Sequence, residues 1–525
     1  MWLFPALSLL LASAAGAPAA TSSPPPRAGA TTRAEPPPGQ ALLPALETLT
    51  PPQRASLEQL LLDMGKATSP DAAIAAADKL LAQLPEPSRL RGMVQFFRAA
   101  PLAASNREPA AALAIEESIR LLPEHSGPLI AAAGIYAYGH TPGRGADHLL
   151  RAAEIDPGAI RSLDEYTVFN LLHRLGAEND KRRVQAISER LLAIDWQGQR
   201  LATQSGLARN TIKAQLARKD VGAARALVPR LLDPADSFHL LTLKEAEPIW
   251  SDIERWAGPK LEKQWAIYLR EAKARWSASK STDTVLDYSA ALEQAHHDRT
   301  LIREVLPLFD APDAEADGDL LFIVARLGAA LAREGRWADA DAMFATARRV
   351  WPLDSQANAL NIAANHAVHL FRAGRTADGL NRMDEALRAA SGLGAQVNSD
   401  AIRAMHWSRA CALVLAGRER EAAASVAAVL GHAQPVSKAT LQLCLNDRAA
   451  AKRSIMEALQ HPDQRDSVIG FLQIQGQPIR GSRFSNALYS RYEALRTDPE
   501  LLAAAAPYGR VLPFRVAEGA PPEAP

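Results

Sequence analysis

The stretch LGAALAREGRWADADAMFATARRVWP, residues 327–352, places large and small apolar residues at helical spacing. Steps of three or four residues put each apolar series on one face of a helix. Small residues beside bulky rings let two helices approach closely. Gly335 and Pro352 stand where helices commonly end. The stretch therefore predicts a helical hairpin with an interlocking interior.

This pattern resembles the tetratricopeptide repeat (TPR), in which Val324 would replace the usual early Trp. A repeat of this kind cannot bury its apolar face alone, so the resemblance implies neighbouring repeats. The residues that carry the resemblance are Leu327, Gly328, Leu331, Gly335, Trp337, Ala340, Phe344, Ala347 and Pro352.

Further copies follow the first repeat. Residues 365–387 and 407–430 repeat the pattern, and 446–463 keep a weaker form of it. Upstream, Pro123 and Pro157 are 34 residues apart, the standard period of the family. Strand-like alternation of Val, Ile and Thr is absent from the sequence. The expected fold class is all-α, a superhelical array of antiparallel helix pairs of the TPR-like α-solenoid type.

The expected domain organisation follows from composition along the chain. The segment 310–319 is acidic and has no large apolar residue, which favours a linker between two arrays. The predicted parts are a signal peptide (1–17), a Pro-rich disordered linker (18–40), a divergent helical-repeat array (41–309), the acidic linker (310–319), a regular TPR array (320–480), a capping helix with a carboxy-terminal segment (481–517) and a disordered tail (518–525).

The amino-terminal segment indicates export. Its apolar run has the length of a signal peptide and ends in small residues, with cleavage expected near Ala17–Ala19. The run contains Pro5 and is shorter than a membrane span of about 20 residues. No Cys follows it, which excludes a lipid anchor of the bacterial lipoprotein type. We expect a periplasmic or secreted protein without a membrane span after cleavage.

No motif of the sequence indicates catalysis. Phosphate loops, nucleophile elbows and zinc-binding pairs are absent, so no cofactor or metal is expected. The run from His296 to Asp298 is interpreted as a helix end. A net charge of +1 gives no pull towards nucleic acid. Trp250, Trp256, Trp265 and Trp276 either form an exposed aromatic platform or fill a core, and burial is favoured.

The resemblance implies a partner-binding site on the first helix of each regular repeat, because in this family those helices line the concave surface that binds peptides. A polar stripe on an apolar helix needs either water or a partner, and plain exposure to solvent is the alternative. The family's set for gripping a terminal carboxylate is matched only at Asn365. The candidate partner-binding residues are Phe322, Arg326, Asn361, Asn365, Arg372 and Trp407.

These observations favour a non-catalytic exported scaffold or adaptor that binds a protein or peptide, in cell-envelope assembly or secretion. The alternative is a helical-repeat envelope enzyme that acts on glycan or peptidoglycan, with its site in the divergent half. Such an enzyme would bring two carboxylates, or a His and a carboxylate, together with shifted pKa values.

The chain has two cysteines, Cys411 and Cys444, on the expected first helices of successive repeats. Packed helices have axes 8–10 Å apart, and a disulfide needs α-carbons within about 7 Å. The two residues also differ in their place along the repeat. The sequence therefore favours two buried thiols over a disulfide, although an oxidising compartment would permit the bond.

Overall fold

Antiparallel helix pairs make up most of the structure, a computed structural model in which no β-strand occurs within the described residues. These residues are 48–84, 87–105, 107–139, 141–161, 163–178, 180–196, 198, 200–310, 320–353, 358–393, 397, 399–431, 434–473 and 479–523. The predicted signal peptide, the Pro-rich linker and residues 311–319 of the acidic linker lie outside them. None of the described helices is long and apolar enough to cross a membrane.

The chain forms two compact units, and the division falls near helix α12 (Leu201–Ala217). The amino-terminal unit contains the described residues up to 198 together with Gly206–Ala214, and the carboxy-terminal unit contains Arg200–Ser205 and Gln215–Pro525. The compact units therefore divide near α12 and not at the predicted boundary of 310–319. The reason is that α19 packs against both α17 and α18, so the array continues across the acidic segment.

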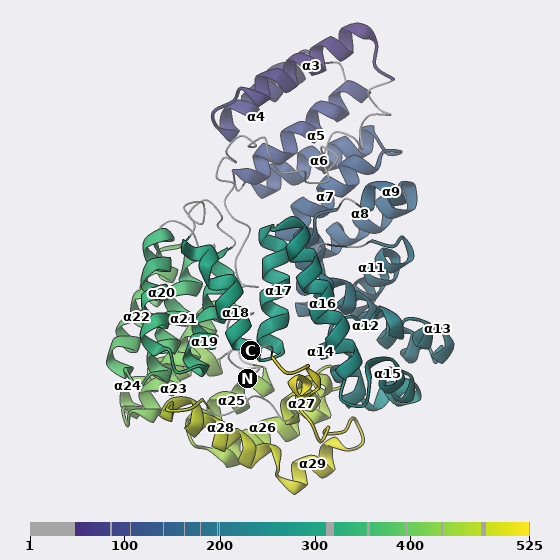
Figure 1. Cartoon of the computed structure of the whole chain (residues 1–525). Coiled ribbons are helices and arrows are strands. Elements are labelled where there is room, and N and C mark those ends of the chain that lie inside the picture. Colours follow the sequence, from purple (N-terminus) through teal and green to yellow (C-terminus); the bar gives the residue numbers. More distant parts are fainter. Residues whose placement is uncertain are drawn as a thin grey trace. The chain divides into compact units, whose positions relative to one another are not determined.

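The amino-terminal unit is a row of helix pairs (Figure 1). The first helices α3, α5, α7 and α10 contact one another in sequence, and each packs on its following second helix. The helices are α3 (Pro51–Gly65), α4 (Pro70–Leu81), α5 (Arg89–Ala104), α6 (Glu108–Leu121), α7 (Ser126–Tyr138), α8 (Pro142–Ile155), α9 (Pro157–Ile160), α10 (Glu165–Ala177) and α11 (Lys181–Ala193).

The carboxy-terminal unit begins with short, irregular helices and continues into regular pairs. Its first part contains α13 (Val221–Ala226), η2 (Val228–Arg230), α14 (Pro234–Thr242), η3 (Lys244–Ile249), α15 (Trp250–Ala257), α16 (Glu262–Ser279), α17 (Thr282–Gln294), α18 (Asp298–Val305) and η4 (Leu306–Asp310). The regular part contains α19 (Leu321–Arg333), α20 (Trp337–Val350), α21 (Ala359–Arg372), α22 (Thr376–Leu393), α23 (Ser399–Leu415), α24 (Glu419–Leu430), α25 (Pro435–Cys444) and α26 (Arg448–Gln460). After these come α27 (Arg465–Leu472), α28 (Arg483–Arg496), α29 (Pro499–Ala505) and η8 (Val516–Gly519).

The regular pairs confirm the predicted repeat. Phe344 of α20 is fully buried, and a Cβ placed on Gly328 of α19 would lie 2.6 Å from its ring. The next pair exchanges the two roles, because Phe371 on the first helix lies over Gly379 on the second. After α19 the chain turns at Gly335 with a φ of 75°, a backbone conformation that favours glycine. The fold is an all-α, TPR-like array of helix pairs.

A strap formed by residues 506–523 returns to the start of the carboxy-terminal unit. The Arg510 amide donates to Thr242 O (2.8 Å), and the Trp265 indole donates to Val516 O (2.6 Å). Glu523 accepts from the Thr300 amide at the start of α18. The expectation of a disordered tail from 518 is therefore corrected as far as Glu523, because helices earlier in the unit supply partners for its polar groups.

The four tryptophans serve mainly to bury apolar surface. Trp265 and Trp276 are buried, as predicted. Trp250 and Trp256 are half-buried, and each indole N–H donates to a backbone carbonyl. The guanidinium of Arg510 lies 3.7 Å from the ring centre of Trp250, so the strap covers part of that residue. These rings do not form a shared open platform.

Cys411 and Cys444 form a disulfide between α23 and α25, which corrects the expectation of two thiols. Their α-carbons are 5.1 Å apart. The sequence argument used the separation of helix axes, but α-carbons on facing sides stand about 2.3 Å from each axis. An axial separation of 8–10 Å therefore leaves facing α-carbons only about 3.4–5.4 Å apart. The bond links neighbouring first helices.

We expect Gly328→Ala to destabilise the α19–α20 pair by about 1–3 kcal/mol, because the added methyl would overlap the buried ring of Phe344. Gly206→Ala is the matched control, since a Cβ at that place in α12 meets nothing within 4 Å and should be neutral or slightly stabilising. Hydrogen exchange resolved by segment measures both. Equal protection of α19–α20 in the two variants would contradict this packing.

Thiol counting on denatured protein tests the disulfide. The chain should give no reactive thiol without reductant and two after reduction, because its only cysteines are bonded to each other. A sample that is reduced, refolded and then handled in the same way before the count controls for air oxidation. Two thiols in the untreated protein would contradict the bond.

Candidate functional site

The first helices of the regular repeats form the predicted binding surface, which we call the inner face (α19, α21, α23 and α25). None of the six predicted residues on it is fully exposed. Asn361 and Trp407 are buried, at 7% and 5% exposure, while Phe322, Arg326, Asn365 and Arg372 are half-buried. The inner face is therefore not an open groove.

Two predicted basic residues of the inner face share an acidic neighbour. Arg326 lies 3.3 Å from the Glu293 carboxylate of α17 and donates to Ser289 Oγ (3.1 Å). Burial and the charge of Arg333 together lower the pKa of Arg372 to about 10, and Glu293 opposes this shift. Arg326 and Arg372 thus both lie near the charge of Glu293.

The amide residues of the predicted stripe do not point to a ligand. Asn365 Nδ2 donates to the carbonyl of Asn361 on its own helix, at 2.8 Å. This bond uses the amide within α21. Asn365 is thus bonded within α21, while Arg326 bonds to α17.

Helix α28 covers the carboxyl ends of α21 and α25, two helices of the inner face. The ring of Phe484 lies 5.8 Å from that of Phe371 at the end of α21. Phe484 and Leu488 belong to the same buried apolar cluster as Trp407. The predicted capping helix therefore extends beyond the last pair, onto the surface proposed for a partner.

A second cluster gathers three acidic side chains between α14, α16 and α17. The Asp233 carboxylate accepts from the Ala235 amide (2.8 Å) at the start of α14, and Asp287 accepts from the Leu201 amide (3.2 Å) at the start of α12. Burial, helped by the neighbouring charges of Asp236 and Asp287, raises the pKa of Asp233 to about 7, and hydrogen bonds from Ala235 and Gln294 oppose the rise. Burial also raises the pKa of Asp287.

Tyr268 completes this acidic cluster. It is fully buried, and its hydroxyl has no hydrogen-bond partner among the described residues. Burial raises the pKa of Tyr268 well above its ordinary value, and the charges of Asp233 and Asp287 add to the effect. The carboxylates converge as an enzyme site would require, but Asp233 and Asp287 are buried and each holds the amino end of a helix.

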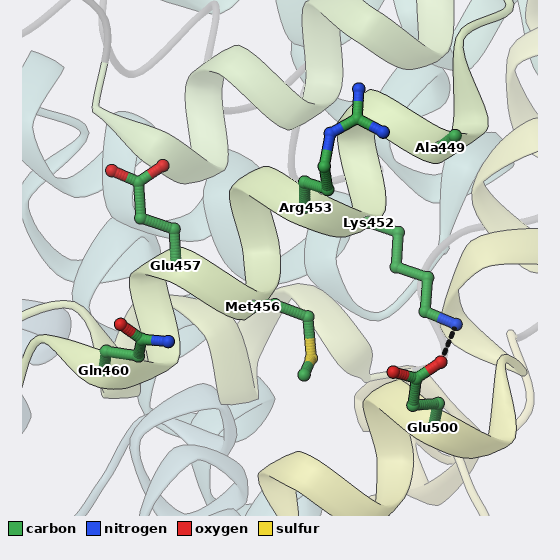
Figure 2. Close-up of a pocket in the computed structure, with 7 residues that line it drawn as sticks. All are labelled: Ala449, Lys452, Arg453, Met456, Glu457, Gln460 and Glu500. Carbon is green, nitrogen blue, oxygen red and sulfur yellow. Dashed lines mark hydrogen bonds and ion pairs between the residues drawn. The ribbon is translucent and has the colours of Figure 1, made fainter.

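A shallow hollow of about 560 Å³ lies between α26 and α29 (Figure 2). Lys452 lies in ion-pair contact with Glu500 (2.6 Å) and Asp498 (2.9 Å). In the figure, Glu457 and Gln460 lie away from that pair. The remaining lining residues are Ala449, Arg453 and Met456. Since its lysine is already neutralised within the chain, the hollow offers no convergent set of free polar groups.

The amino-terminal unit carries exposed aromatic residues on two neighbouring first helices. Tyr138 at the end of α7 is 45% exposed, and Phe169 of α10 is 40% exposed. The ring of His173 stacks on Phe169 with centroids 5.9 Å apart. Partial burial and the charge of Asp164 together raise the pKa of Tyr138 to about 12, and hydrogen bonds with Asn170 and Thr167 of α10 oppose the rise. We call Tyr138, Phe169 and His173 the aromatic face.

The aromatic face was not predicted from the sequence, although one signal was available. In α10 the buried residues Val168, Leu171 and Leu175 follow helical spacing, and Phe169 falls outside that stripe. A large aromatic residue off the apolar stripe of an amphipathic helix indicates a surface role. The acidic cluster gave no such signal, because its residues come from helices far apart in the sequence.

Comparisons with known proteins give only distant similarities to solved structures. No protein-family model and no curated protein matches this sequence. Among solved structures, the TPR domain of P58(IPK) has 14% identity and a TM-score of 0.20, covering 78% of this chain and 99% of that one. The Cut9–Hcn1 hetero-tetramer of APC/C has 11% identity and a TM-score of 0.27, with coverages of 85% and 97%.

A third similar structure is Naa15/Naa10 bound to HypK-THB, with 12% identity and a TM-score of 0.22. The match covers 89% of this chain and 78% of that chain. With TM-scores this low, none of the three places a residue of this chain in a site. The TPR-like character rests on the helix pairs and the glycine–phenylalanine contacts described above.

The raised pKa of Asp233 predicts a pH dependence of stability. A pKa raised in the folded state means that this group contributes stability below about pH 4, which is lost as pH rises through 7. Asp233→Asn keeps a capping side chain but removes the charge. Relative to the unsubstituted protein, the variant should gain roughly 2–4 kcal/mol of stability between pH 4 and pH 8.

Denaturant unfolding at both pH values measures this difference. Asp220→Asn makes the same exchange at the cap of α13 and controls for loss of a carboxylate cap. If the difference in unfolding free energy between Asp233→Asn and the unsubstituted protein is the same at both pH values, the carboxyl of Asp233 is ionised at both.

Proposed function

We propose that this chain is a non-catalytic, exported scaffold that binds a protein partner through the aromatic face of its amino-terminal unit. The observation that carries the proposal is the exposure of Tyr138 and Phe169 on adjacent first helices. Elsewhere in the described pairs, aromatic rings such as Phe344 and Phe371 are buried. Aromatic side chains with exposed faces are the usual anchors of protein interfaces.

The chemistry of the aromatic face defines the partner. Its rings offer apolar area, and Asn170 beside Tyr138 offers an amide at the same place. The partner is accordingly a protein segment with apolar side chains and free backbone groups. The mechanism is complementarity across a helical surface without a covalent step.

Export is part of the proposal and has two supports. The amino-terminal sequence has the pattern of a signal peptide, and the two cysteines of the chain are joined in one buried disulfide. Stable disulfides form in oxidising compartments such as the periplasm and are rare in the cytosol. We place the protein in the periplasm or outside the cell, in envelope assembly or secretion.

The enzyme alternative has one observation in its favour, the convergence of Asp233, Asp236 and Asp287. Asp233 and Asp287 already accept bonds from backbone amides at helix starts. A pair of catalytic carboxylates for glycan hydrolysis must reach substrate from both sides of the bond. Buried caps do not have that access, so the scaffold is the better supported function.

A photo-reactive residue at position 169 tests the binding surface in intact cells. With benzoylphenylalanine in place of Phe169, irradiation should give a covalent adduct with one other protein. The same residue in place of Leu113 is the control, because Leu113 lies on the second helix α6 and is 75% exposed. The Tyr138→Ala background should reduce the yield at 169 several-fold.

Two results would overturn this function. One is the absence of any adduct at 169 in cells that contain the folded protein. The other is the same set of adducts at 169 and 113, which would indicate contact without a defined surface.

A further inference from the structure

Two histidines of α21 face the neighbouring pair formed by α19 and α20. His366 and His369 are three residues apart, so they lie on the same side of the helix. Both are buried, at 7% and 3% exposure. The ring of His366 stacks on that of Phe344 in α20, with centroids 4.9 Å apart, and the ring of His369 lies 5.5 Å from that of Trp337. The junction between the two pairs therefore contains two titratable rings.

The histidines belong to the main packing contact of this part of the array. Phe344 fills the space beside Gly328 within its own pair, and it stacks on His366 of the next pair. In a repeat array each pair is stabilised largely by its neighbours. A change of charge on His366 thus acts on the contact between two pairs.

One carboxylate lies close to both imidazoles. Nε2 of His366 and Nε2 of His369 are each 3.4 Å from Asp341 Oδ1 in α20. The same carboxylate forms an ion pair with Arg375 through Oδ2, and its side chain is 30% exposed. Asp341 is therefore shared among three basic groups and partly screened by solvent, so it compensates only in part for positive charge on the histidines.

The other charges that act on the two histidines are positive. The charge of Arg382 lowers the pKa of His366, and those of Arg372 and Arg375 lower the pKa of His369. Helices α23 and α28 meet α21 in an apolar cluster. The charged groups around the junction, besides Asp341, are Arg372 on α21, Arg333 of α19 beside it, and Arg375 and Arg382 at α22 with their partners Asp378 and Glu385.

A proton added to His366 has no acceptor at this junction. His366 Nδ1 and His369 Nε2 have no hydrogen-bond partner in the part of the chain that the structure describes, and neither has Asp341 Oδ1. A neutral imidazole donates from one nitrogen, whereas an imidazolium donates from both. Protonation thus leaves a charged N–H of His366 buried without a partner, which is unfavourable. Burial lowers the pKa of both imidazoles to about 4, and the charge of Asp341 opposes this shift.

We propose that the junction between the α19–α20 and α21–α22 pairs is an acid-sensitive joint, in which protonation of His366 and His369 separates the two pairs. Above the ordinary histidine pKa of about 6.5 both rings are neutral whether the pairs are joined or separated, so the full stability of the junction is present. As the pH falls from there towards 4, the separated pairs take up protons that the joined pairs do not, and this stability is lost. The joint is distinct from the aromatic face and goes beyond the proposed binding function.

Hydrogen exchange of the full chain at about pH 7.5 and about pH 4.5 tests the joint. Protection factors, which correct for the pH dependence of the intrinsic exchange rate, should fall at least about tenfold in α20 and α21 at the lower pH. Those of α25 and α26 should change less, because these helices lie outside the junction. The direction is opposite to that expected from Asp233, whose contribution to stability is lost as the pH rises.

A double variant removes the two titrating groups. His366→Leu with His369→Leu keeps an apolar side chain against Phe344, so α20 and α21 should have equal protection factors at the two pH values. His461→Leu is the matched control, because it makes the same exchange at an exposed residue after α26. The control should keep the acid response of the unsubstituted chain.

Exchange at the Cε1–H position of each histidine, followed in the unsubstituted chain, gives its pKa without any substitution. His366 and His369 should titrate below about pH 5.5. Titration of both near 6.5 would overturn the proposal, and so would unchanged protection of α20 and α21 at the lower pH. An acid response that persists in the double variant, or that is equally large in α25 and α26, would show that acid acts elsewhere in the unit. Adduct formation at position 169 does not depend on this joint, so its failure leaves the scaffold function standing.

Discussion

The regular part of this protein depends on the close approach of a glycine on one helix to an aromatic ring on the helix paired with it. At Gly328 the ring of Phe344 occupies the space of the missing Cβ, and at Gly379 the ring of Phe371 does the same. Each contact fixes the distance and angle between two helices, because any other crossing would open a void or a clash. Since each pair then packs on the next, this local rule sets the direction of the whole array.

The same arrangement explains why the inner face is closed. First helices that pack closely bring their polar residues together on the inner face. There Arg326 forms an ion pair with Glu293, and Arg333 donates two 2.7 Å hydrogen bonds to Asp298. Helix α28 covers the remaining apolar part around Trp407. Surface open to another protein is then found on the aromatic face, where Phe169 falls outside the packed stripe.

The sequence was informative where the chemistry was local. Spacing and glycine positions predicted the helix pairs and the burial of Phe344, because both depend on residues within one repeat. It failed for contacts between distant segments. The strap, the placement of α28 and the acidic cluster of Asp233 and Asp287 all join residues whose relation no periodicity reveals. The disulfide was missed for a geometric reason, because the distance between helix axes exceeds that between facing α-carbons.

The strap also sets the order in which the carboxy-terminal unit is able to fold. Arg510 bonds to Leu241, 269 residues away, and Trp265 bonds to Val516, 251 residues away. Contacts of such high sequence separation form late, because a long loop must close before they are gained. Until residues near 510 are synthesised, α14 to α16 lack the strap residues that form hydrogen bonds with them. The carboxy-terminal unit therefore completes its fold only after residues 506–523 have been synthesised.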